Sequence, residues 1–262
     1  MQERHLNKEQ YFNEQSKASE QYIFPYINNV LPISSGMDIA EIGCGYGGNL
    51  KPFLDNGCKV VGIDINSYSI ELAEKFYENY KNKNNINFII RNIYDVLPEE
   101  LPAFDLIFMR DTLEHIHNQE HFLKHVKSFL KPEGKLFLAF PPWRMPFGGH
   151  QQMCKNKFLA ILPYFHILPK PIYKGILKLF GEKDITINSL LETQSTRISL
   201  QKFYKIIKND YIIEKQTFYI INPNYKIKFG IKPRILPRIF RIPFVRDFFV
   251  STYYCILKIK TL

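Results

Sequence analysis

Residues 110–118, RDTLEHIHN, hold two carboxylates and two imidazoles within nine positions. They directly follow FDLIFM, an apolar run that is typical of a buried strand. Such residues at the end of a core strand can begin a solvated helix, contact a cofactor, relay a proton or bind a metal ion. The elements that flank the segment decide among these four roles.

One helical turn after the strand would place Asp111, Glu114 and His115 on one side, because they are spaced i, i+3 and i+4. His150, in FGGHQQ, follows a later strand and can reach the same pocket. Three roles are compatible with this set. First, the four residues can hold a divalent cation. Second, His115 or His150, with Glu114, can act in general-base catalysis without a metal. Third, Glu114 and His115 can have a purely structural role in which they cap the turn. Base catalysis without a metal is the preferred interpretation.

Three further histidines, His117, His121 and His125, recur every four residues. This spacing resembles a metal-binding helix face. Lysines alternate with them and no acid accompanies them, so the pattern predicts a solvated face.

A glycine-rich loop, EIGCGYGGNL, follows an apolar run at 37–43. Its glycines Gly43, Gly45 and Gly48 fit G-x-G-x-x-G, and Asp64 ends the next apolar run twenty-one residues after Gly43. An acid at that place can accept hydrogen bonds from ribose hydroxyls. Glu41, just before the loop, suits the amino-acid end of a ligand better than a pyrophosphate. The loop therefore predicts a nucleotide-type cofactor.

The first 140 residues alternate between apolar runs and segments with helical period. Expected strands lie at 37–43, 58–65, 86–90, 104–109 and 134–140. Expected helices lie at 8–31, 69–82 and 119–130, and KPEG at 131–134 is expected to end the last of these. Such alternation predicts an α/β fold with a parallel sheet, helices on both faces and ligands beyond the carboxyl ends of the strands.

The composition changes after residue 141, where Pro, Gly, aromatic and Lys residues dominate. This predicts an insertion of short helices, whose aromatics, Trp143 and Phe165 among them, either line an acceptor pocket or form a small core. Ser199 is expected to cap a helix, and strands are expected at 211–221 and 249–260. The expected divisions are a helical cap at 1–35, a cofactor-binding core at 36–142, an insertion or lid over the acceptor site at 143–195, and the C-terminal part of the same α/β domain at 196–262.

Several of these motifs together resemble the class I S-adenosylmethionine-dependent methyltransferases. The matching segments are AEIGCGYGGNL, VVGIDI, IIRNIYDVLP, FDLIFMRDTLEHI and LKPEGKLFLAFP, all within about residues 35–142. The D-x-x-E-H pattern with a later histidine is closest to the ubiquinone-biosynthesis O-methyltransferases. It is also similar to the small-RNA 2′-O-methyltransferases, which use E-x-x-E-H and a later histidine around a divalent cation.

The resemblance implies a Rossmann-like sheet of seven strands with an antiparallel last strand and a helical insertion after strand five. It makes the basic segment 232–249 the connection between strands six and seven. Asn92 stands where the family usually has an acid, and its amide can meet the adenine edge. The implied contacts to S-adenosylmethionine are at Glu41, Gly43, Cys44, Gly45, Gly47, Asp64, Ile65, Asn92, Ile93 and Arg110.

The expected function is methyl transfer from S-adenosylmethionine to a small molecule, with a hydroxyl of a lipid-like, glycan or secondary-metabolite compound as the expected acceptor. A non-catalytic protein that binds the same cofactor is one alternative. A nicotinamide-dependent oxidoreductase is another, although Glu41 and the LKPEGK strand argue against it. A divalent cation is a second, less favoured cofactor.

Composition limits the partners and the compartment. The 262 residues are enough for one large α/β domain with an insertion or for two small domains, and 45% of them are hydrophobic. The net charge of +10 predicts acidic partners. Segments that mix Lys or Arg with large apolar residues, such as LPRIFRIPFVRDFF, predict peripheral contact with an anionic membrane. The sequence has no block of Lys and Arg alone, so it gives no strong indication of nucleic-acid binding. Four scattered cysteines and a polar first segment predict a cytoplasmic protein that can lie at the inner face of the membrane.

Overall fold

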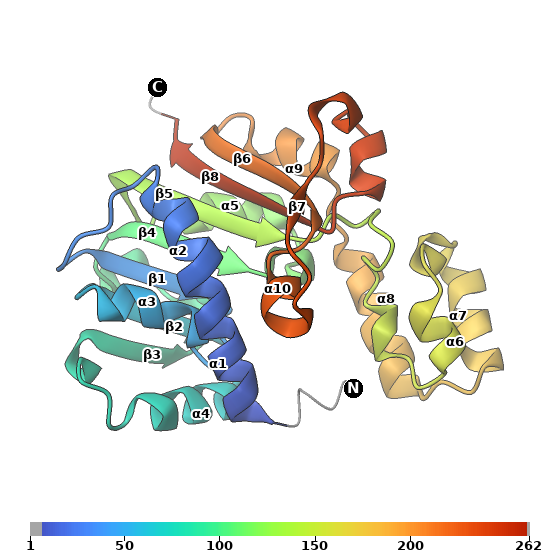
Figure 1. Cartoon of the computed structure of the whole chain (residues 1–262), viewed down its shortest axis with the longest axis horizontal. Coiled ribbons are helices and arrows are strands. Elements are labelled where there is room, and N and C mark those ends of the chain that lie inside the picture. The colour runs from blue at the N-terminus through green and yellow to red at the C-terminus, as the bar shows by residue number, and fades with distance from the viewer. Residues whose placement is uncertain (1–6, 261–262) are drawn as a thin grey trace.

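The computed structural model describes residues 7–260. Residues 1–6 of the expected cap and residues 261–262 of the expected C-terminal part lie outside the described residues. A twisted sheet forms the centre of the molecule, helices cover both of its faces, and a helical insertion stands beside it (Figure 1).

Five parallel strands build the half of the sheet that the sequence predicts most clearly. They are β1 (Asp38–Ile42), β2 (Lys59–Asp64), β3 (Ile86–Ile90), β4 (Phe104–Arg110) and β5 (Leu130–Phe140). Their order in the sheet is β3-β2-β1-β4-β5. The order reverses between β1 and β4, which is where ligands bind in open parallel sheets.

The rest of the sheet is antiparallel. β8 (Thr252–Ile259) pairs antiparallel with β5, and β6 (Tyr211–Ile221) pairs antiparallel with β8. The antiparallel last strand is therefore confirmed. The sheet has eight strands rather than seven, because the expected connection 232–249 adds a two-residue strand, β7 (Arg234–Ile235), at the edge beside β6.

Helices cover both faces of the sheet. On the face toward the viewer in Figure 1, α1 (Lys8–Ala18) runs through one π-helical turn (Ser19–Ile23) into α2 (Phe24–Asn28). Four further α-helices belong to the part of the molecule that contains the sheet. They are α3 (Lys51–Asp55), α4 (Ser67–Tyr77), α5 (Gln119–Lys127) and α9 (Leu200–Ile207). As expected, the Ser199 hydroxyl caps α9 by accepting from the Lys202 amide at 3.2 Å.

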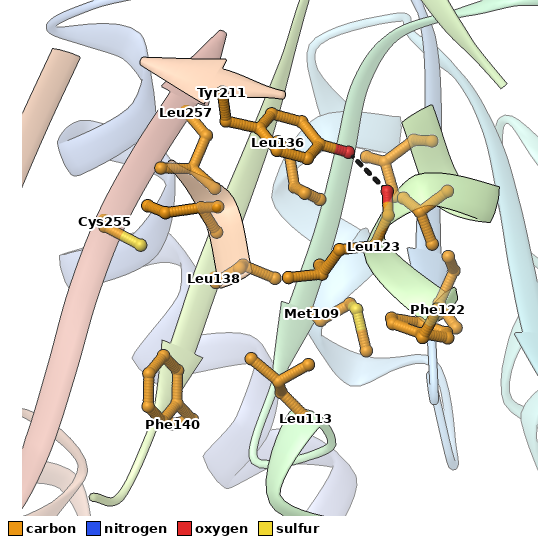
Figure 2. Packing of buried hydrophobic residues seen from close by; sticks show 14 of the residues in the cluster. Met109, Leu113, Phe122, Leu123, Leu136, Leu138, Phe140, Tyr211, Cys255 and Leu257 are labelled. Carbon is orange, nitrogen blue, oxygen red and sulfur yellow. Dashed lines mark hydrogen bonds between the residues drawn. The ribbon is translucent and has the colours of Figure 1, made fainter. Parts of the chain in front are cut away.

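Alternate residues of each strand point to opposite faces, so the sheet has two hydrophobic cores. One core packs Met109, Leu136 and Leu138 against α5 and α9, and the Tyr211 hydroxyl closes it by donating to the Leu123 carbonyl at 2.7 Å (Figure 2). The other packs Phe108 and Phe137 against α1, α2 and α3. Burial on both faces explains the continuous apolar runs of these strands.

The segment between α5 and β5 differs from the expectation. The helix ends at Lys127, and β5 begins at Leu130 rather than at residue 134. The reason is long-range: the Lys131 ammonium bonds the carboxylates of Asp105 (2.7 Å) and Asp38 (3.1 Å), which draws the chain along the start of β4. The register then shifts between Phe104 and Leu106, where a β-carbon on Gly134 would lie 2.7 Å from a carbonyl oxygen.

The insertion has its own small core. It contains α6 (Lys157–Ile161), α7 (Lys170–Leu179) and α8 (Asp184–Thr196), packed around Tyr173, Leu177 and Leu190. A last helix, α10 (Asn224–Phe229), follows β6 and lies near α1 (Figure 1). Within residues 7–260, none of the helices is both long enough and apolar enough to cross a membrane.

We expect Phe137→Ala to lower the free energy of unfolding by about 3–5 kcal/mol, because it leaves a cavity in the core. Phe137 is fully buried in β5, with its ring centroid 5.3 Å from that of Tyr254 and 5.7 Å from that of Tyr26. Denaturant unfolding measures the change. The exposed control Leu97→Ser should stay within about 0.5 kcal/mol of the wild type, and an equally small loss for Phe137→Ala would contradict the packing described here.

Candidate active site

The glycine loop after β1 has a backbone that side chains would obstruct. Gly43, Gly45 and Gly47 have φ of 76°, 53° and 73°, the left-handed region that favours glycine. A β-carbon on Gly43 would also lie 2.5 Å from the Thr112 side chain, which follows β4. The loop can therefore pass close to the end of β4 only with glycine at position 43.

The carboxylate of Asp64, at the end of β2, holds this loop in place. One oxygen accepts from the Gly45 amide at 2.8 Å, and the other accepts from the Asn66 amide at 2.9 Å. A carboxylate has about four acceptor positions. Two acceptor positions therefore remain for a ligand.

A buried polar chain links the loop to β4. The Asn49 amide donates to Glu41 Oε1 at 2.6 Å, and Arg110 Nη1 donates to Asn49 Oδ1 at 2.8 Å. Glu41 is fully buried and its second carboxylate oxygen has no hydrogen-bond partner. Burial raises the pKa of Glu41 to about 8, although the Asn49 hydrogen bond and the Arg110 charge act against this rise.

These elements surround a polar cavity of about 270 Å³, which we call the cofactor cavity. Three of the predicted contact residues, Gly43, Gly45 and Arg110, line it. Asp111, which the sequence analysis considered only as a metal ligand, lines it as well. The sequence interpretation missed the remaining lining residues, which are Tyr11, Gln15, Tyr46, Asn49, Ser69 and Thr112. The only sequence feature that relates Tyr11 and Gln15 is their spacing of one helical turn on α1. This spacing does not by itself predict that they face the glycine loop.

Seven of the ten predicted contact residues lie outside this lining, and they are Glu41, Cys44, Gly47, Asp64, Ile65, Asn92 and Ile93. Glu41 and Asp64 are nevertheless hydrogen-bonded to the lining residues Asn49 and Gly45. The Cys44 side chain is buried in a hydrophobic core, and Ile93 is buried in the other. Ile65 is 74% exposed, and Asn92 is exposed with its side-chain oxygen accepting from the Tyr94 amide. Asn92 therefore caps a short 3₁₀ helix, and the adenine contact stays a prediction.

The chain turns sharply where β4 ends. Asp111 has a φ of 52°, which is unusual for a residue with a side chain. Its amide donates to the Ala139 carbonyl of β5 at 2.8 Å, and its carboxylate lies 3.5 Å from Arg110 Nε. A 3₁₀ helix at Leu113–His115 follows. A helical turn after the strand was expected, but it begins only after Asp111.

Glu114, His115 and His150 come together beyond this turn. One potential ligand atom from each lies within 4.8 Å of the others, and the two imidazole centroids are 4.9 Å apart. His150 also has a left-handed backbone, with a φ of 57°. Asp111, the fourth predicted ligand, lies outside this group of three.

Glu114 is the buried member of this group, whereas His150 is half-buried and His115 is exposed. Both carboxylate oxygens of Glu114 are buried and lack a hydrogen-bond partner. Burial, and then repulsion by Asp111, raise the pKa of Glu114 well above its usual value. Burial lowers the pKa of His115, and burial with repulsion by His115 lowers the pKa of His150 to about 4. At neutral pH, both imidazoles are uncharged and can act as ligands.

A second cavity of about 520 Å³ opens beside this group; we call it the acceptor cavity. It shares Asp111 with the cofactor cavity. The loop after β5 and the helix α10 form much of its wall. The lining residues are Asp111, Glu114, Pro141, His150, Gln152, Met153, Asn222, Asn224, Tyr225 and Lys228.

His117, His121 and His125 lie outside the linings of both cavities. His117 pairs with Glu192 of the insertion and His121 is exposed, as expected for a solvated face. His125 departs from that expectation, because it is half-buried and hydrogen-bonded to the Ile93 carbonyl at 2.9 Å.

The aromatic residues of the insertion pack rather than line the acceptor cavity. Trp143 contacts His166 edge to face at 4.6 Å, and Phe165 contacts Tyr173 in the insertion core. Neither is in the cavity lining. The insertion does touch the site through α8, because the Thr196 hydroxyl donates to the Glu114 carbonyl at 2.6 Å.

Known proteins share this fold and these segments. The ubiquinone biosynthesis O-methyltransferase of Rattus norvegicus is 33% identical over 107 residues, which are 40% of this chain and 31% of that protein. The counterpart from Coxiella burnetii is 29% identical over 104 residues, 40% of this chain and 43% of that protein. The chain thus spans less than half the length of these curated relatives.

Among solved structures, magnesium protoporphyrin IX methyltransferase from Synechocystis PCC 6803, with bound SAH, superposes with a TM-score of 0.55. It shares 15% identity over 97% of this chain and 88% of that one, so the likeness concerns the fold. A family model described as a methyltransferase domain matches residues 13–162, more than half of the chain. The chain therefore belongs to the methyltransferase domain family, among the class I S-adenosylmethionine-dependent methyltransferases.

Proposed function

We propose that the chain transfers a methyl group from S-adenosylmethionine in the cofactor cavity to a hydroxyl group in the acceptor cavity. The observation that carries this proposal is that Asp111 lines both cavities, beside the group of Glu114, His115 and His150. A donor and an acceptor on either side of Asp111 would be adjacent, as transfer of a methyl group requires.

Charges around the cofactor cavity fit the donor. The free acceptor positions of Asp64 suit ribose hydroxyls. Arg110 lines the cavity and supplies a cation for the carboxylate of the amino-acid end. With its pKa raised to about 8, the Glu41 carboxyl is mostly protonated at neutral pH. The sulfonium and ammonium of the donor are both cations, and their binding nearby would favour its ionised form.

The sulfonium already activates the methyl group, so the protein mainly aligns the reacting atoms. A hydroxyl acceptor must also lose its proton as the new bond forms. His150 and Glu114 line the acceptor cavity, where such a proton is released. With a pKa of about 4, the His150 imidazole is free to accept a proton but is a weak base.

We therefore propose that Glu114, His115 and His150 hold a divalent cation. The fit rests on two unpartnered carboxylate oxygens beside two uncharged imidazoles, since burying such a carboxylate without a partner is costly. A bound cation would lower the pKa of an acceptor hydroxyl. Asp111, paired with Arg110, is then a neighbouring negative charge rather than one of the three grouped ligands.

The acceptor that we propose is lipid-like, with a glycan or secondary-metabolite hydroxyl as further members of the class. The acceptor cavity combines apolar surface from Met153, Pro141 and Tyr225 with the amides of Asn222 and Gln152. The names of the curated relatives specify O-methylation in ubiquinone biosynthesis, which supports a hydroxyl acceptor. The insertion is proposed as a lid over this cavity, and an anionic membrane as a peripheral partner.

Removing the Asp64 carboxylate should weaken cofactor binding. We expect Asp64→Ala to reduce the affinity for S-adenosylhomocysteine by about tenfold to a hundredfold, because a charged hydrogen-bond acceptor is lost and the glycine loop is released. Isothermal titration calorimetry measures this. Glu133→Ala removes an exposed carboxylate from β5 and should bind as the wild type does; unchanged affinity in Asp64→Ala would refute the ribose role.

Removing one grouped ligand should remove cation binding. We expect the wild type to bind Mn²⁺ or Zn²⁺ at one site in calorimetric titrations, and Glu114→Gln to bind at least about tenfold more weakly. Glu192→Gln changes an exposed acid of α8 and serves as the matched control. If the wild type binds neither ion and chelators leave its turnover unchanged, the cation proposal is wrong.

Loss of the His150 imidazole should separate cofactor binding from turnover. We expect His150→Ala to bind S-adenosylhomocysteine normally and to lower kcat by about 10²–10⁴-fold. Transfer of label from S-adenosylmethionine into a solvent extract of cells measures turnover, with His121→Ala as control. Full turnover in His150→Ala would exclude a catalytic role, and cofactor binding without any transfer by the wild type would favour the non-catalytic alternative.

A further inference from the structure

Residues 232–249, which we call the strap, expose an unusual number of large apolar side chains. Seven are exposed within fifteen positions, and they are Ile235, Ile239, Phe240, Ile242, Phe244, Val245 and Phe249. Their exposed fractions run from 43% for Val245 to 75% for Ile239. Grouped apolar exposure of this kind marks a surface that contacts something other than water.

Buried anchors fix the strap in this conformation. The Leu236 amide donates to the Phe218 carbonyl of β6 at 2.7 Å, and the Leu236 side chain is buried. Near the other end, the buried Asp247 carboxylate accepts from the Leu200 amide at 3.0 Å. Arg246 is held between these points, with its guanidinium 4.8 Å from the centre of the Phe218 ring. The apolar side chains are therefore presented by a tethered segment.

The strap is predominantly positively charged. It contains the cations Lys232, Arg234, Arg238, Arg241 and Arg246, and Asp247 is its only acid. Lys232, Arg234 and Arg238 are exposed, and none of the three forms an ion pair within residues 7–260. Asp247 is buried and lies 3.7 Å from Arg144. The exposed surface of the strap is therefore cationic and apolar together.

We propose that the strap docks the protein onto an anionic lipid bilayer, with its Ile and Phe side chains in the interface and its free cations against the lipid headgroups. Apolar side chains that enter the interface and cations that meet anionic headgroups are the two contributions that hold peripheral proteins on membranes. A second copy of the chain is a poorer occupant, because a symmetric contact would face the strap's cations with themselves.

The strap is also linked to the two segments that form much of the acceptor-cavity wall. Helix α10, which supplies Asn224, Tyr225 and Lys228 to that cavity, ends three residues before the strap. The loop after β5 reaches it from the other side, because the Arg144 guanidinium lies 4.3 Å from the centre of the Phe244 ring. If the proposed lipid-like acceptor is correct, docking would bring the acceptor cavity close to its source.

Vesicle sedimentation tests the docking independently of methyl transfer. We expect the wild-type protein to sediment with equimolar phosphatidylcholine–phosphatidylglycerol vesicles, to bind phosphatidylcholine vesicles more weakly, and to be released by salt. Ile239→Ser/Ile242→Ser and Arg234→Glu/Arg238→Glu should each lower the partition coefficient by about tenfold or more. Leu97→Ser/Ile212→Ser removes two exposed apolar side chains elsewhere and should bind as the wild type does.

Three results would overturn the proposal. The first is a wild-type protein that stays in the supernatant with both vesicle types. The second is that the strap variants sediment like the wild type. The third is a wild type that is dimeric by light scattering, with strap variants that are monomeric. Circular dichroism of each variant checks that the fold is kept.

Discussion

The buried guanidinium of Arg110 is the constraint on which the site depends. A charge with only 8% of its side chain exposed needs hydrogen-bond acceptors, and it has them on two sides. Asn49 accepts on the glycine-loop side and thereby presents its own amide to Glu41. Asp111 pairs with the guanidinium on the other side. Arg110 lines the cofactor cavity and pairs with Asp111, which lines both the cofactor cavity and the acceptor cavity.

Several residues near Arg110 have energetically unfavourable conformations or surroundings. Asp111 and His150 have left-handed backbones, and Glu114 is buried with both oxygens unpartnered. Such features persist only where the surrounding structure determines them. Here the amide of Asp111 is bonded to β5, and the carbonyl of Glu114 is bonded to Thr196 of the insertion. A ligand or cation that neutralises Glu114 would relieve part of this cost, which is the physical reason to expect one at this place.

Local patterns were sufficient to predict the parallel strands and the glycine loop from the sequence, whereas the antiparallel direction of the last strand was implied only by the resemblance to the methyltransferases. Apolar runs, left-handed glycines and the acid of Asp64 each depend on a few neighbouring residues. The start of β5 could not be predicted in this way, because it follows from Lys131 meeting Asp38 and Asp105. Tyr11 and Gln15 were missed for the same reason, since only tertiary packing brings α1 over the loop. Asp111 was grouped with Glu114 by helical spacing, whereas its backbone turns before the helix begins.

Diffraction from crystals grown with S-adenosylhomocysteine and Mn²⁺ tests the central claim most directly. The account predicts S-adenosylhomocysteine between the glycine loop and Tyr11, with its ribose at Asp64. It also predicts an anomalous manganese peak among Glu114, His115 and His150, on the acceptor side of Asp111. S-adenosylhomocysteine in the cavity with no anomalous signal at those three residues would contradict the cation site, and S-adenosylhomocysteine bound elsewhere would contradict the account as a whole.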